Sequence, residues 1–201
     1  MATIHIPYAM PGLNEYLLVI APPEHVRNRI QQIREDFRLL TGYDTPVRRP
    51  HITLLKFHQR EMGEHRLLNK LNSIARAQAP VKMELSGFGS FPTHSIFIKA
   101  DGGHRYTELV KSFRAAQSLM KADPEKEPHF MTTPFINIAR KLLPHQYEKG
   151  WNVYQHKHFT SRFMADNLLL LKKRDGERAY QIVQALKLEH APLEVKQAVL
   201  F

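Results

Sequence analysis

A histidine and a threonine that stand two residues apart, His51 and Thr53, are the side chains of this sequence best suited to chemistry. Alternate residues of a β-strand point to the same face, so within a strand these two side chains project together. An imidazole can move a proton and a hydroxyl can hydrogen-bond an oxygen, a combination that suits a phosphate ester. Alone, the tripeptide more often marks an ordinary strand histidine, so the elements around it must decide its meaning.

Apolar patterns on both sides of this pair predict a β-α-β-α-β unit that occurs twice. The strands expected in the first half are residues 16–20, 51–57 and 81–85. Those expected in the second half are residues 95–99, 135–139 and 168–171. Amphipathic helices are expected over residues 26–40, 61–75, 106–120 and 144–154. The turn Asp175-Gly176 then predicts a closing hairpin with a last strand over residues 180–188.

Such a duplication predicts equivalent positions in the two halves of the chain. We expect an α+β fold in which residues 1–201 form a single bilobal domain, with interlocked lobes near residues 1–90 and 91–201. Two sheets should face a central cleft, with the helices outside. A cleft between two sheets is where a ligand would bind.

The composition indicates a globular protein that attracts polyanions. The 201 residues carry a formal net charge of +10, which fits nucleic acid or a nucleotide as partner and is equally consistent with a lysine-rich surface. The lack of cysteine excludes disulfides and thiolate chemistry, and no apolar run approaches the roughly 20 residues that span a bilayer. We therefore expect a cytoplasmic protein with no membrane segment, and we favour a monomer. No Walker, zinc or dinucleotide motif is present, so neither a metal nor a cofactor is expected.

The strand Pro50-His51-Ile52-Thr53-Leu54, placed after a β-α unit in a duplicated chain, resembles the two-histidine (2H) phosphoesterases. These include the RNA 2′,3′-cyclic phosphodiesterases once called 2′-5′ RNA ligases. The resemblance covers residues 16–188 in the order of elements, and its residue match is limited to residues 50–54. It implies two His-x-Thr/Ser motifs that face each other across a cleft, without a metal. One histidine would act as base and the other as acid, and the hydroxyl groups would hold the phosphate.

The second motif departs from this pattern. Phe135 and Asn137 stand 84 residues after His51 and Thr53 in a similar apolar frame. The helices expected near Glu61 and Pro144 are 83 residues apart, which agrees with that offset. We therefore predict that Phe135 and Asn137 are the degenerate counterparts of the first motif. Asn137 could still donate to a phosphate oxygen, and the Phe135 ring could stack on a base but cannot transfer a proton.

Two other histidines compete for the role of the missing one. His158, in His158-Phe159-Thr160, matches the motif literally, but its offset of 107 places it where an outer strand should begin. His129 has an offset of 78 and is followed by Thr132, a spacing that splits the pair between the two faces of a strand. We keep His129 as a substitute that could supply an imidazole from a loop.

Two basic pairs flank the motif strands and are candidates for binding phosphate or RNA. Arg48 and Arg49 precede Pro50, and Arg140 and Lys141 follow the second strand as their rough counterparts. The first hypothesis for function is a metal-independent phosphodiesterase acting on RNA or nucleotide 2′,3′-cyclic phosphates or 2′-5′ linkages, weakened by the lost histidine. The alternative is a catalytically inactive relative that binds RNA or a phosphorylated small ligand.

Overall fold

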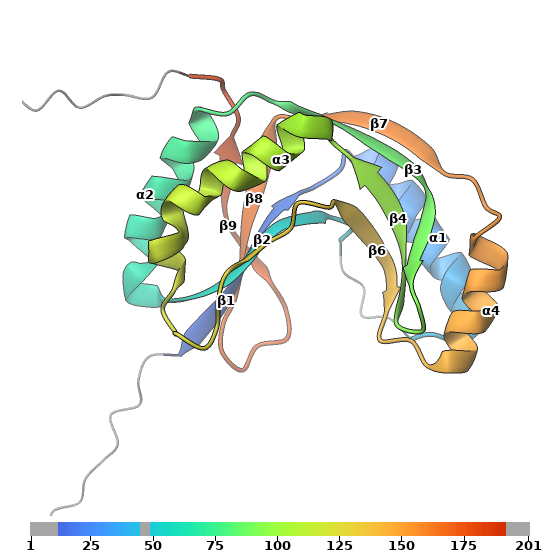
Figure 1. Cartoon of the computed structure of the whole chain (residues 1–201). Coiled ribbons are helices and arrows are strands. Elements are labelled where there is room, and N and C mark those ends of the chain that lie inside the picture. The colour runs from blue at the N-terminus through green and yellow to red at the C-terminus, as the bar shows by residue number, and fades with distance from the viewer. Residues whose placement is uncertain (1–11, 45–48, 192–201) are drawn as a thin grey trace, which may run out of the picture.

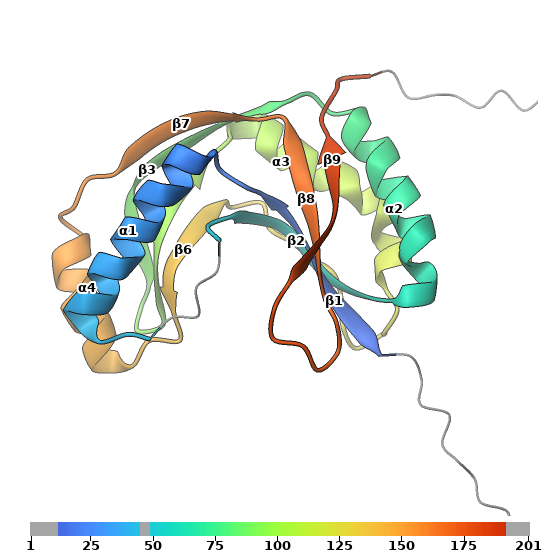
Figure 2. The ribbon, with the colours of Figure 1, turned by 180° about the vertical axis from the view of Figure 1, so that it is seen from behind.

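The computed structural model describes residues 12–44 and 49–191 and shows two antiparallel sheets that together form an arch (Figures 1 and 2). The strands of the first sheet are, in spatial order, β5 (His129–Phe130), β2 (Ile52–Arg60), β1 (Leu13–Ile20), β8 (Asn167–Lys173) and β9 (Gln181–Lys187). The strands of the second sheet are β6 (Phe135–Arg140), β4 (Ser95–Asp101), β3 (Val81–Phe91) and β7 (Thr160–Ala165). The expected α+β fold with two sheets is confirmed.

Helices cover the outer side of both sheets (Figures 1 and 2). They are α1 (Glu24–Thr41), α2 (Glu61–Arg76), α3 (Gly103–Ser112) and α4 (Pro144–Tyr154), with a 3-10 helix η1 (Phe113–Met120) directly after α3. The helix expected over residues 106–120 is therefore two pieces. The helix α2 contacts η1 and β9 of the first sheet, and α1 contacts α4 and β6 of the second sheet.

The helix α1 crosses from one sheet to the other. It follows β1 of the first sheet along the chain but packs beside α4 against the second sheet. A glycine in α4 allows this close approach, because a Cβ atom on Gly150 would lie 2.4 Å from the ring of Phe37 in α1. In the opposite sense, α3 and η1 follow β4 of the second sheet, and η1 contacts β2 of the first sheet.

The two sheets do not follow the two halves of the sequence. The strand β3 belongs to the second sheet, and β8 and β9 return to the first. The boundary expected near residue 90 consequently falls inside β3. The order β2-β1-β8-β9 in one sheet matches the order β6-β4-β3-β7 in the other, so each strand of one set has a counterpart in the other. In this correspondence β6 is the counterpart of β2.

The side chains of each strand divide between a core that faces the helices and a face that points to the inside of the arch. In β1, Tyr16 and Leu18 are fully buried, and the Tyr16 hydroxyl donates to Glu64 of α2 at 2.5 Å. In β4, Ile96 and Ile98 are fully buried, and Ile96 packs near Gly150 of α4. No helix in the described part of the chain is long and apolar enough to cross a membrane.

Candidate functional site

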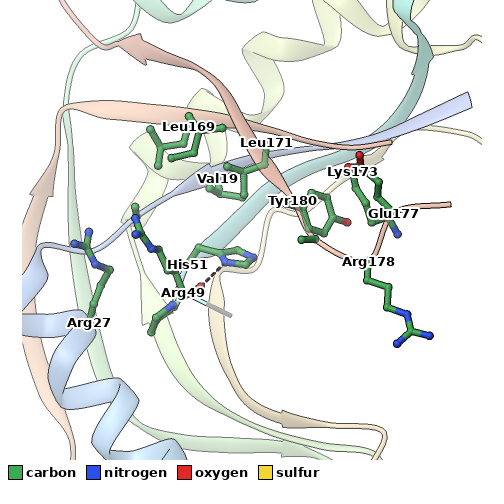
Figure 3. A pocket seen from close by; sticks show the side chains of 14 residues that line it. Val19, Arg27, Arg49, His51, Leu169, Leu171, Lys173, Glu177, Arg178 and Tyr180 are labelled. Carbon is green, nitrogen blue, oxygen red and sulfur yellow. Dashed lines mark hydrogen bonds between the residues drawn. The ribbon is translucent and has the colours of Figure 1, made fainter. Parts of the chain in front are cut away.

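A cavity of about 1000 Å³ lies on the inner face of the first sheet, between the start of β2 and the β8–β9 hairpin (Figure 3). Its apolar wall is formed by Val19, Leu169, Leu171 and Ile182. Its polar groups come from both sides, and they include Arg27, Arg49, His51, Lys173, Arg178 and Tyr180. The cavity therefore joins an apolar surface to a ring of cations, an arrangement suited to a ligand that carries a phosphate and an apolar group.

His51 stands directly before β2 and points into this cavity, as does Tyr180 from the hairpin (Figure 3). The Nδ1 atom of His51 lies 2.8 Å from the backbone oxygen of Arg49. Because a carbonyl oxygen can only accept, Nδ1 carries the hydrogen of this bond. In the neutral ring the basic atom is then Nε2, which is the atom able to take a proton from a hydroxyl or a water.

Thr53 shares the face of the sheet that lines the cavity. It is paired with Val19 across the β1–β2 ladder, and paired residues of an antiparallel ladder point to the same side. Val19 is a lining residue, while Ile52 between the two motif residues is fully buried on the helix side. The expectation that His51 and Thr53 lie on one face thus agrees with the ladder.

A tyrosine from the other lobe supports the backbone of Thr53. Tyr106 of α3 donates from its hydroxyl to the oxygen of Met131 at 2.9 Å and to the oxygen of Thr53 at 3.4 Å. Burial raises the pKa of the Tyr106 hydroxyl, so it stays protonated and acts as a donor. This contact fixes the motif strand to the segment that leads into β6.

The strand β6 repeats the geometry of β2. Ile52 pairs with Ile20 at the end of β1, and Ile136 pairs with Ile98 of β4. Each ladder then has a bulge at the residue that follows the motif, which is Leu54 in β2 and Ile138 in β6. Phe135 and Asn137 are half-buried on the inner face, as His51 and Thr53 are. Pairing, bulge and burial therefore place Phe135 and Asn137 at the positions in β6 that His51 and Thr53 hold in β2.

An arginine supports β6 in the way that Tyr106 supports β2. Arg34 of α1 donates to the backbone oxygen of Asn137 from Nη2 at 2.6 Å and from Nε at 3.2 Å. Burial, with a smaller contribution from the nearby charge of Arg140, lowers the pKa of Arg34 to about 10. Each motif strand is thus held at the second motif position by a side chain from a helix that follows a strand of the other sheet.

A cluster of charges lies further along the inner face of the first sheet. The Glu15 carboxylate accepts from the Tyr180 hydroxyl and pairs with Lys56 at 2.8 Å and Lys173 at 3.2 Å. His58 lies 3.6 Å from the same carboxylate. Burial alone would raise the pKa of Glu15, but the hydrogen bonds from Lys56, Tyr180 and Lys173 lower it to about 2. The cluster holds Tyr180 and Lys173 at the cavity wall.

The competing histidines lie elsewhere. His129 pairs with Lys56 at the edge of the first sheet, roughly 16 Å along β2 from His51 at about 3.3 Å per residue. This placement does not bring its ring to the position of Phe135. His158 is exposed and precedes β7, which β3 and β4 separate from β6.

The two basic pairs occupy different ends of the motif strands. Arg49 lies at the cavity, whereas Arg48 falls outside the described residues. Arg140 and Lys141 are exposed at the far end of β6, where the Tyr43 hydroxyl donates to the backbone oxygen of Arg140. In the register of the motifs Arg140 corresponds to Lys56, so the two pairs are not counterparts.

Sequence patterns did not identify the cavity residues contributed by the hairpin. Lys173 and Arg178 were indistinguishable from a solvated hairpin tip, and Tyr180 from an ordinary strand residue. Their role depends on β8 pairing with β1, a contact between residues far apart in the sequence. Within residues 12–44 and 49–191, no group of three or more His, Asp or Glu side chains is placed to hold a metal ion.

Comparisons with known proteins identify a family and related folds. A family model described as the 2′-5′ RNA ligase superfamily matches residues 22–177. The protein TT0787 of Thermus thermophilus is similar in structure, with 20% identity and a TM-score of 0.66 over 87% of this chain and 98% of that chain. E. coli LigT in its apo form has 14% identity and a TM-score of 0.62 over 88% and 98%.

LigT has also been crystallised with 3′-AMP, and that structure has 15% identity and a TM-score of 0.61 over 87% of this chain and 98% of that chain. Further crystals of LigT contain phosphate or ATP. At these identities the likeness concerns the fold. No match was found among proteins with curated descriptions.

Proposed function

The chain belongs to the 2′-5′ RNA ligase superfamily, and from this premise we propose that it is a metal-independent phosphodiesterase of 2′,3′-cyclic phosphates or 2′-5′ linkages in RNA or nucleotides. The family match confirms the resemblance seen in residues 50–54. The LigT crystals with 3′-AMP, phosphate and ATP support a nucleotide or phosphate ligand. The observation that carries the proposal is the placement of His51 and Thr53 on one face of a cationic cavity.

In the proposed reaction the groups act on a cyclic phosphate as follows. Nε2 of His51 takes a proton from a water as the water oxygen attacks phosphorus. One of the two ring P–O bonds breaks, and the leaving ribose oxygen takes a proton from solvent. The Thr53 hydroxyl donates to a non-bridging phosphate oxygen throughout. Arg49 and Lys173 at the cavity offset the negative charge that develops.

The second half of the site has no side chain that can protonate the leaving oxygen at the position of His51's counterpart. Phe135 occupies that position, and a positioned acid or base contributes roughly 10²–10⁴-fold in rate. Asn137 retains an amide that can donate to the phosphate. We therefore expect slow turnover with a phosphate grip that is close to intact.

A second candidate function follows from the same position. If the loss of an acid at residue 135 removes turnover altogether, the chain is a protein that binds RNA or a phosphorylated ligand in the cavity without cleaving it. The Phe135 ring favours this function, because a side chain without a proton replaces a catalytic group while the pocket beside His51 persists.

Hydrolysis of 2′,3′-cyclic nucleotides and of cyclic-phosphate-ended RNA in the presence of a chelator tests the first function. We expect slow hydrolysis by the wild type and none by His51→Ala. Thr53→Val should weaken phosphate binding, because it removes the hydroxyl and keeps the shape.

His158→Ala is the matched control, since it removes an exposed histidine at the outer strand of the other sheet and should leave the rate unchanged. A wild-type rate equal to that of His51→Ala would reject the enzyme for these substrates. Phosphate and RNA binding by the same proteins would then decide for the binding function.

A further inference from the structure

Three phenylalanine rings gather on the inner face of the second sheet. Phe91 ends β3, Phe97 lies in the middle of β4, and Phe135 begins β6. The centroid of the Phe97 ring lies 4.8 Å from that of Phe91 and 5.0 Å from that of Phe135. Phe91 and Phe135 are 5.7 Å apart in an edge-to-face arrangement. We call this group the aromatic platform.

The platform lies on the side of the sheet away from the core. Phe97 pairs with Asn137, so its ring shares the face of the second motif. The neighbouring residues Ile96 and Ile98 are fully buried on the opposite side, toward α4. Phe91 nevertheless leaves 49% of its surface exposed, whereas aromatic rings that contribute only to packing are mostly buried.

The backbone beneath the platform is shaped to hold a ring flat. Gly89 of β3 pairs with Phe97, and a Cβ atom at this position would lie 2.5 Å and 2.7 Å from two atoms of the Phe97 ring. Any other residue at this position would lift that ring from the sheet. The glycine therefore lets the Phe97 ring lie directly against the strand, which leaves the other side of the ring toward the inside of the arch.

A cation stands beside the rings. Lys99 pairs with Phe135 and is exposed on the same face. Its side chain runs along the glycine row of β3, with its Cγ atom 3.4 Å from the Cβ position of Gly89. Aromatic rings next to a lysine are the combination by which proteins hold single-stranded nucleic acid, because the bases stack and the backbone phosphates are neutralised.

We propose that Phe91, Phe97 and Phe135 form a stacking platform for a nucleobase of single-stranded RNA, with Lys99 beside the adjoining phosphate. The inference deepens the proposed function and rests on it for the position of the phosphate at His51 and Thr53. Both motif strands border the inside of the arch (Figure 1), so the phosphate and the base of one ligand would lie on facing sheets. The net charge of +10 favours a polyanion over an apolar protein segment as the occupant.

The platform is tested by the difference in affinity between two RNAs. One is a short single-stranded RNA of adenosines, and the other has the same phosphates but abasic nucleotides. The wild type should prefer the adenosine RNA. Phe91→Ala should weaken binding of that RNA by roughly 5- to 150-fold and leave binding of the abasic RNA unchanged, because only stacking is lost. Phe91→Trp should restore the preference.

Met164→Ala serves as the control, because Met164 is a similarly exposed apolar residue on the outermost strand β7 and should affect neither RNA. Equal affinity of the wild type for the two RNAs would overturn the platform. So would a dimer that Phe91→Ala dissociates, since the rings would then be a contact between copies of the chain.

Hydrolysis of a cyclic phosphate on base-free ribose separates this inference from the proposed function. His51→Ala should abolish that hydrolysis and keep the preference for adenosine RNA. Hydrolysis without any base preference would reject the platform alone. Base preference without hydrolysis would reject the enzyme alone.

Discussion

A phenylalanine at position 135 and a histidine at position 51 occupy equivalent points of two similar strands, and they can do different chemistry. The imidazole of His51 exchanges a proton near neutral pH, whereas the Phe135 ring offers only an apolar face. Substitution at one of two equivalent positions therefore exchanges proton transfer for surface contact. The residue pairs that follow, Thr53 and Asn137, both keep a group that can donate to a phosphate oxygen.

Restoring the second motif should raise turnover at the expense of base binding. We expect Phe135→His combined with Asn137→Thr to increase kcat for a 2′,3′-cyclic nucleotide by roughly 10²–10⁴-fold, because an acid for the leaving oxygen becomes present. The same variant should lose part of the preference for adenosine over abasic RNA, because one ring leaves the platform. Steady-state kinetics and RNA titrations measure the two effects. An unchanged kcat would show that position 135 does not face the reacting phosphate.

At the scale of the elements, each motif strand depends on a helix from the other lobe. Tyr106→Phe removes the hydroxyl that donates to the oxygens of Thr53 and Met131, so we expect a loss of about 1–2 kcal/mol in the free energy of unfolding. We also expect a lower kcat, because the motif strand is no longer fixed. Denaturant unfolding and cyclic-phosphate hydrolysis check the two outcomes.

Tyr154→Phe is a matched control for this effect. Tyr154 of α4 is also a buried tyrosine, and its hydroxyl donates to the backbone oxygen of Ile33 at 3.0 Å, away from the motif strands. Its loss should cost a similar amount of stability and leave kcat unchanged. Equal effects of both variants on kcat would show that only general stability is at work.

The charge cluster of the first sheet gives stability a defined pH dependence. The pKa of Glu15 is about 2 in the folded protein, against an ordinary value of 4.5. Because the unfolded chain binds the proton more readily, the contribution of Glu15 is fully present above pH 4.5 and is lost as the pH falls toward 2. Glu15→Gln should destabilise the protein by about 1–2 kcal/mol at pH 7 and much less near pH 2.

Unfolding free energies at several pH values measure this dependence. Glu35→Gln is the control, since Glu35 pairs with Arg38 on the exposed side of α1 and should change stability little at any pH. A loss for Glu15→Gln that is the same at pH 7 and pH 2 would show that packing, and not charge, is responsible.

The elements were largely predictable from the sequence, and the way they combine was not. Apolar alternation located the strands around His51 and Phe135, because the core face of a strand imposes a period of two residues. The offset of 84 residues between the motifs survived because both strands carry the same bulge. The pairing of β8 with β1, and hence the role of Tyr180 at the cavity, depends on contacts between residues about 150 positions apart in the chain, for which local patterns carry no signal.

At the scale of the whole molecule, two exchanges join the lobes. The strand β3 leaves the first half of the chain for the second sheet, and β8 and β9 return to the first. The helix α1 packs on the second sheet although it joins two strands of the first. Neither sheet can therefore assemble from one half of the sequence, so the lobes should gain and lose their structure together.

This interlocking predicts a single unfolding transition for the full chain. Trp151, the one tryptophan of the sequence, lies half-buried on α4 beside the second sheet, so its fluorescence reports on that lobe. Far-ultraviolet circular dichroism reports on all helices and strands. We expect the two denaturation curves to have the same midpoint and slope, because loss of either sheet removes strands and a helix that the other requires. If the fluorescence change preceded the loss of circular dichroism, the second lobe would unfold on its own, and the exchanged elements would be contacts between two independently stable units.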